Sequence, residues 1–123
     1  MQTIKAFRPD SEFFLEEGCY IIELHNSADD DGCSIARARV EPGKITELHC
    51  LQDIVERYVI VSGSGEVELD GQAPVAVAAM DVVIIPAAVS QRIRNTGESD
   101  LVFLCVCTPR FDQKEYRQVT TQG

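Results

Sequence analysis

The sequence predicts an all-β protein, an antiparallel jelly-roll β-barrel or a related sandwich in a single domain. Three observations support this fold class. About eight short stretches are rich in β-branched residues, and several alternate between apolar and polar positions. Turn-forming residues separate these stretches. No long stretch has helical periodicity, and a chain of 123 residues without a repeat or linker suits one hydrophobic core.

The barrel is expected over residues 19–109, between an irregular lead-in (1–18) and a polar, peripheral tail (110–123). Within the lead-in, residues 11–15 allow either a short helical turn or an edge strand. Asp70-Gly71 is a strong hairpin signal. The expected strands are, in chain order, 19–24, 34–41, 44–51, 56–61, 66–70, 73–78, 82–85, 90–95 and 101–107.

The strand expected at 34–41 shows which side chains face the interior. Ala36 and Ala38 lie on one face and Arg37 and Arg39 on the other, because side chains alternate along a strand. Burying two arginines without partners is costly, so we expect the alanine face inside, where small side chains leave room for a pocket. The opposite arrangement would line the pocket with two cations and favour an anionic ligand.

Charge and hydropathy restrict the partners and the location. The formal net charge of −9 makes nucleic acid and anionic membranes poor partners. No apolar run reaches the roughly 18 residues that a membrane span needs. The first ten residues lack the apolar core of a signal peptide, so the expected location is the cytoplasm.

The five cysteines are expected to be reduced, because their number is odd, no C-x-x-C pair occurs and no secretion signal precedes them. Cys105 and Cys107 lie two residues apart in a predicted strand, so they share one face. They act either as buried apolar groups or, if that face turns inward, as soft metal ligands.

A polar motif lies between Pro42 and Gly63. Gly43, His49, Glu56 and Gly63 match the spacing of G-x5-H-x-H, a short spacer and E-x6-G. This motif is the first of two that define the cupin superfamily, which the chain therefore resembles. Leu51 stands at the position of the motif's second histidine.

The second cupin motif, G-x5-P-x-G-x2-H-x3-N, is matched in part. Pro86 and Asn95 agree with it, whereas Met80 and Ala88 replace its two glycines and Gln91 replaces its histidine. We expect Asn95 to fix the turn that follows it. Within the superfamily the chain looks like the small proteins described as mannose-6-phosphate isomerase-like, a label that refers to similarity and not to activity.

The resemblance implies a jelly-roll barrel with an interior site in which three histidines and one glutamate hold a divalent metal. Here the remaining ligands would be His49, Glu56 and Gln91, with Leu51 inert, for zinc, manganese, nickel or iron. The alternative is a metal-free hydrogen-bonded cluster, in which His49 pairs with Glu56 and Gln91 satisfies the remaining donors and acceptors.

We expect further side chains to line the pocket. Tyr58 shares the face of Glu56, and Glu47 shares the face of His49. Glu47 either adds a metal ligand or lies in solvent at the barrel mouth. The expected pocket residues are Ala36, Ala38, Glu47, Leu51, Tyr58 and Cys105.

Two functions are compatible with this pocket. One is a metal-dependent isomerase, oxygenase or lyase that acts on a small polar metabolite, with Glu56 or Glu47 as its base. The other is a binding or sensing module without catalysis. The strands at 82–85 and 101–107 are apolar on both faces, which predicts a homodimer that covers the outward face.

Overall fold

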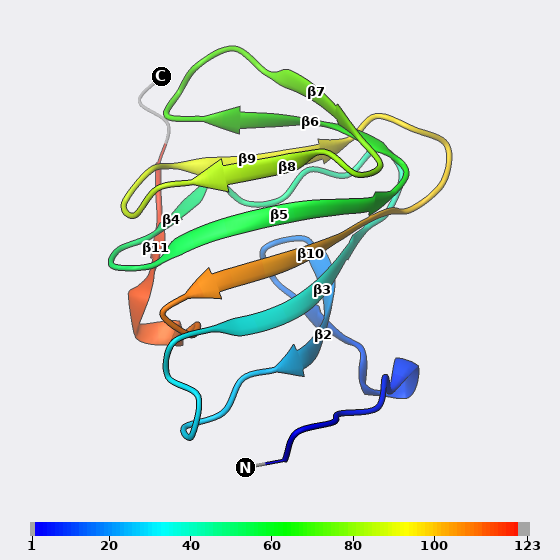
Figure 1. The fold of residues 1–123 in the computed structure, drawn as a ribbon. Coiled ribbons are helices and arrows are strands. Elements are labelled where there is room, and N and C mark those ends of the chain that lie inside the picture. Colours follow the sequence, from blue (N-terminus) through cyan, green and yellow to red (C-terminus); the bar gives the residue numbers. More distant parts are fainter. Residues whose placement is uncertain (1, 121–123) are drawn as a thin grey trace.

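The computed structural model describes residues 2–120 and confirms the all-β fold, which is two antiparallel sheets packed face to face (Figure 1). One sheet has the order β1-β2-β3-β10-β5-β8 and the other β11-β4-β9-β6-β7. The elements in chain order are η1 (Pro9–Ser11), β1 (Phe13–Leu15), β2 (Cys19–His25), β3 (Ser34–Val40), β4 (His49–Leu51), β5 (Val55–Ser62), β6 (Ser64–Leu69), β7 (Val75–Ala78), β8 (Val82–Ile85), β9 (Gln91–Asn95), β10 (Leu101–Thr108), η2 (Gln113–Glu115) and β11 (Tyr116–Gln118). Within residues 2–120, no helix has the length and apolar character needed to cross a bilayer.

The hydrophobic core fills one part of the space between the sheets. Val40, Ile93 and Leu101 are completely buried there, and Ile60 of β5 joins the same cluster. Every second residue of β5 is buried, as a strand with one face against a core requires. On that buried face Ile60 packs in the core, whereas Glu56, nearer the start of the strand, lines a cavity.

Strand β3 has the orientation that the sequence predicts. Ala38 is buried beside the core, and Ala36 packs against it. Arg39 and Arg37 lie on the outer side, where the Glu12 carboxylate accepts hydrogen bonds of 2.7 and 3.2 Å from their terminal nitrogens. The interior therefore does not contain the two cations of the opposite arrangement.

Both termini differ from the predicted lead-in and tail. Residues 9–15 contain both a 3₁₀ turn, η1, and an edge strand, β1, which pairs with β2. The tail is not peripheral, because β11 pairs with β4 and places Tyr116 opposite Leu51. Each strand has only three residues, too few for alternation to reveal it, and each forms by pairing with a neighbouring strand.

The two residues that replace motif glycines keep a glycine-like backbone. Met80 has φ 74° and Ala88 has φ 66°, which is the left-handed region that side chains with a Cβ rarely adopt. The motif glycines Gly43 and Gly63 also have positive φ, 77° and 86°. All four positions thus have a left-handed backbone, with strain where the side chain has a Cβ.

Met80→Gly is expected to stabilise the fold by about 0.5–1 kcal/mol. Relief of left-handed strain contributes roughly 1–2 kcal/mol, and the greater entropy of unfolded glycine offsets part of it. Met80 is 81% exposed, so little packing is lost. Urea unfolding measures the change. Met80→Ala, which keeps the Cβ, is the control and should leave stability unchanged; an equal gain in both variants would contradict the explanation.

Candidate functional site

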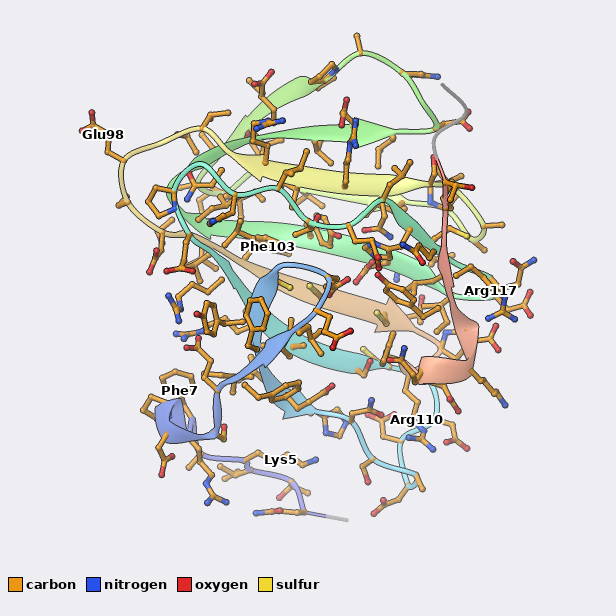
Figure 2. The ribbon with its side chains drawn as sticks, turned by 180° about the vertical axis from the view of Figure 1, so that it is seen from behind. Lys5, Phe7, Glu98, Phe103, Arg110 and Arg117 are labelled. Atoms are coloured by element: carbon orange, nitrogen blue, oxygen red, sulfur yellow. The ribbon has the colours of Figure 1, made fainter. Side chains whose placement is uncertain are left out.

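A cavity of about 520 Å³ lies between the sheets, large enough for a small metabolite. The six side chains expected to line it all do so: Ala36, Ala38, Glu47, Leu51, Tyr58 and Cys105. His49 and Glu56 line it as well. In Figure 2 the β1–β2 hairpin passes in front of the sheet near Phe103, another wall residue, and the C-terminal segment borders the same side of the molecule.

Glu56, Gln91 and Tyr58 form a buried hydrogen-bonded chain. Gln91 Nε2 donates to Glu56 Oε1 at 2.8 Å, and the Tyr58 hydroxyl donates to Gln91 Oε1. Gln91 is fully buried and does not line the cavity. The Gln91 amide therefore lies behind the residues that line the cavity, and its hydrogen bond fixes the orientation of the Glu56 carboxyl.

The Glu56 carboxyl is in an environment that favours its protonated form. Burial raises the pKa of Glu56 above its ordinary value, and the hydrogen bond from Gln91 and the nearby His49 side chain oppose this only in part. A protonated Glu56 keeps its bond to Gln91, because its carbonyl oxygen still accepts from the amide. Glu56 is thus a carboxyl at the cavity wall that keeps its proton to a higher pH than an exposed glutamate does.

His49 is held in one orientation by its two neighbours. Its Nδ1 lies 2.8 Å from the carbonyl oxygen of Glu47, and its ring stacks on the Tyr116 ring with centroids 4.7 Å apart. A carbonyl oxygen only accepts hydrogen bonds, so Nδ1 carries the hydrogen and Nε2 of the neutral ring is left as an acceptor. Within residues 2–120 no hydrogen bond joins His49 to Glu56, although the metal-free alternative expected one. The Glu56 carboxyl instead accepts from Gln91 and Cys107.

Two residues that sequence reasoning missed, Glu17 and Tyr116, also belong to the site. The Tyr116 hydroxyl lies 2.5 Å from Glu47 Oε2 and 3.2 Å from Glu17 Oε2. Glu17 comes from the β1–β2 turn, and its carboxylate lies 3.8 Å from His49 Nδ1. Glu47 is therefore not a free group at the mouth. The signal in the sequence was a pair of aromatic residues, Phe111 and Tyr116, in a largely polar tail.

Tyr116→Phe is expected to destabilise the protein by about 1–2 kcal/mol, because two carboxylates lose the hydroxyl between them. Thermal unfolding measures the loss. Tyr20→Phe is the matched control, since no hydrogen bond of the Tyr20 hydroxyl is present in residues 2–120 and its ring packs on Phe14 and Arg39. Equal effects of the two substitutions would contradict a bonding role for the Tyr116 hydroxyl.

Three thiols line the cavity: Cys19, Cys105 and Cys107. Burial is the main cause that raises the pKa of each thiol above its ordinary value, and the nearby Glu56 carboxylate adds to it. The three therefore stay as neutral thiols, and they contribute polarisable, largely apolar wall. Cys50 is buried outside the lining.

The donor set does not fit a metal held as the family motif implies. Of the three candidate ligands, only His49 and Glu56 face the cavity, and both ends of the Gln91 amide are bonded to other side chains. Leu51 has no donor atom. In the part of the chain that the structure describes, no three or more His, Cys, Asp or Glu side chains are grouped to hold a metal ion.

Comparison with known proteins assigns the family. The cupin domain profile matches residues 36–107, more than half of the chain. The chain belongs to the cupin family. An "Oxalate-binding protein" of Thermotoga maritima is 35% identical over 83 residues, which are 68% of this chain and 64% of that relative. The chain thus matches less than two thirds of that cupin's length.

Solved cupin structures support the same fold. A structure described as a predicted oxalate decarboxylase from Thermotoga maritima is 29% identical, with a TM-score of 0.68 over 74% of this chain and 80% of that one. Pac13 from Streptomyces, described as a unique nucleoside dehydratase, has a TM-score of 0.78 over 95% of this chain and 92% of its own. At 19% identity, Pac13 supports the fold alone.

Proposed function

We propose that this cupin binds a small organic molecule in its cavity and transfers protons to or from it, in a reaction of the isomerase or lyase type. The observation that carries the proposal is the buried Glu56 carboxyl at the cavity wall, fixed by Gln91 and with a raised pKa. Raised carboxyl pKa values in a cavity are characteristic of general acids.

The cavity also contains a group that can accept a proton, the His49 ring. His49, with its hydrogen on Nδ1, has a basic Nε2, whereas Glu56 holds a proton. Isomerisation and elimination both need one group that removes a proton and another that delivers one. In this scheme Glu56 donates a proton and His49 accepts one. Both side chains are held in place by hydrogen bonds, Glu56 by Gln91 and His49 by the carbonyl oxygen of Glu47.

A deuterium-exchange experiment tests the proposal without knowledge of the substrate. Small hydroxy and carbonyl compounds that raise the melting temperature of chelator-treated protein are incubated with it in D₂O, and proton NMR follows incorporation at carbon. We expect exchange that Glu56→Gln reduces by about a hundredfold or more. Cys50→Ala, which alters a residue outside the cavity, should retain it. Equal exchange in Glu56→Gln would overturn the role of Glu56.

Metal dependence is tested on the same samples. The protein is reloaded with zinc, manganese, nickel or iron, desalted and analysed for metal. The donor set predicts substoichiometric metal and no recovery of exchange beyond that of chelator-treated protein. One equivalent of metal that is lost in His49→Ala would overturn the metal-free form of the proposal.

Binding without turnover is the second candidate. Its support is the curated relative, whose name describes binding and not catalysis. Compounds that raise the melting temperature but show no exchange in D₂O would favour this candidate. The likeness to mannose-6-phosphate isomerase-like proteins and the cytoplasmic location both stay predictions.

A homodimer is also part of the proposal. Val82 and Ile84 of β8 are 56% and 62% exposed, Val61 of β5 is 48% exposed, and Met80 in the turn before β8 is 81% exposed. Such apolar groups favour a second copy as cover. Light scattering at micromolar concentration should give the mass of a dimer, and Ile84→Asp should give a monomer. A monomeric wild-type protein would contradict this expectation.

A further inference from the structure

We infer that the cavity selects a cationic ligand, a protonated organic amine, and rejects small dicarboxylate anions such as oxalate. This inference rests on the proposed function, because it specifies which molecule that cavity takes. It is based on the sign of the charged groups that line the cavity, on their hydrogen bonds and on the aromatic groups beside them.

Every side chain of fixed charge that lines the cavity is acidic. Five glutamates line it: Glu16, Glu17, Glu23, Glu47 and Glu56. None of the eleven lysines and arginines, all of which lie within residues 2–120, lines the cavity. With Glu56 protonated, four carboxylates still face an incoming ligand. A dianion in this space meets only like charge, whereas an ammonium group is attracted.

The arginines that could have reversed this sign are held outside. Arg37 and Arg39 lie on the strand that lines the cavity with Ala36 and Ala38, but their guanidinium groups bond to Glu12 on the outer face. Because side chains alternate along a strand, the two arginines could face the cavity only if the two alanines faced outward.

Two of the carboxylates are available to a ligand. Glu17 and Glu47 share the Tyr116 hydroxyl, and Glu56 accepts from Gln91. The side chains of Glu16 and Glu23 form no hydrogen bond or ion pair within residues 2–120. Glu23 lies on β2 at the exposed rim, where partial burial raises the pKa of its carboxyl. A carboxylate that a cavity wall partly desolvates without a partner is stabilised by a bound cation.

Aromatic side chains line the same space. Phe13, Phe111 and the Tyr58–Phe103 pair, whose ring centroids are 4.5 Å apart, all line the cavity. Aromatic faces attract ammonium groups and repel carboxylates, because the ring quadrupole is negative on its face. Rings and carboxylates together are the chemistry that recognises an aryl or alkyl amine.

Three probes of matched shape test the inference on chelator-treated protein: benzylamine, benzyl alcohol and benzoate, with oxalate as a fourth. Amide NMR spectra locate and titrate each one. We expect benzylamine to bind at cavity residues about tenfold or more tightly than benzyl alcohol, and benzoate and oxalate to cause no shift there. Added salt should weaken the benzylamine interaction and leave benzyl alcohol unchanged.

Substitutions at the rim give the matched control. Glu23→Gln should weaken benzylamine several-fold and leave benzyl alcohol unchanged. Glu98→Gln removes the same charge from the β9–β10 loop, which Figure 2 shows at the outer edge of the molecule, and should alter neither.

The outcomes separate the two claims. Benzoate or oxalate binding in the cavity as tightly as benzylamine, or equal effects of Glu23→Gln and Glu98→Gln, would overturn the charge selection and leave the cavity as a binding site. Absence of cavity shifts with all four probes would overturn both the selection and the proposed function.

Discussion

Gly63→Ala is expected to lower the free energy of unfolding by about 3 kcal/mol or more. A Cβ at this position would lie 2.7 Å from the carbonyl oxygen of Asp100 and 3.0 Å from the Cα of Leu101. Both are backbone atoms, and Leu101 is completely buried, so neither can give way cheaply. Overpacking typically costs about 1–3 kcal/mol, and left-handed strain at φ 86° adds roughly 1–2 kcal/mol.

Gly43→Ala separates the two contributions. Gly43 has φ 77°, and a Cβ there would meet no atom within 4 Å. Only the strain remains, so we expect a loss of about 1–2 kcal/mol. Urea unfolding of both variants measures the difference. Equal losses would show that the close approach of β10 to Gly63 does not explain why this position of the motif needs glycine.

Glu56→Gln is expected to reduce proton transfer by about a hundredfold or more and at the same time to stabilise the fold at neutral pH, by about 0.5–2 kcal/mol. Burial raises the pKa of Glu56 in the folded protein above its unfolded value. Below the unfolded pKa, Glu56 is protonated in both states. As pH rises, the unfolded chain loses this proton first, so the wild type loses stability until the folded pKa is passed. Glutamine does not ionise and still accepts from Gln91.

The pH dependence distinguishes this explanation from a general gain in stability. The melting temperatures of wild type and Glu56→Gln should converge towards the ordinary glutamate pKa of 4.5 and diverge as pH rises above it. Glu98→Gln, an exposed carboxylate, is the control and should follow the wild type. A destabilised Glu56→Gln at pH 7 would mean that an ionised Glu56 is favourable in the fold.

Local patterns in the sequence were sufficient to predict the strand faces and much of the cavity. The alternation around Ala36 and Ala38 determines which side of β3 is inside, because two unpaired arginines would be costly there. The motif spacing places His49 and Glu56 on neighbouring walls. Asn95 holds its turn as predicted, since its Oδ1 accepts from the Gly97 amide at 2.8 Å.

The rest of the site depends on contacts between segments far apart in the chain. Tyr116 reaches Glu17 across 99 positions, and no periodicity in a three-residue strand reveals such a contact. The position of Gln91 was predicted from the motif, but the direction of its amide was not. That direction is set by the neighbouring Tyr58 hydroxyl and Glu56 carboxyl, which use both ends of the amide.

The central claim is that Glu56 holds a proton in the cavity, and that the side chains of the cavity transfer protons without a metal. Its most direct test is a pH titration of the side-chain carboxyl ¹³C resonances of chelator-treated protein, with Glu56 assigned by the signal absent from Glu56→Gln. We predict a midpoint above the ordinary value of 4.5. A midpoint at or below 4.5 would contradict the claim, because Glu56 would then be ionised at neutral pH and have no proton to donate.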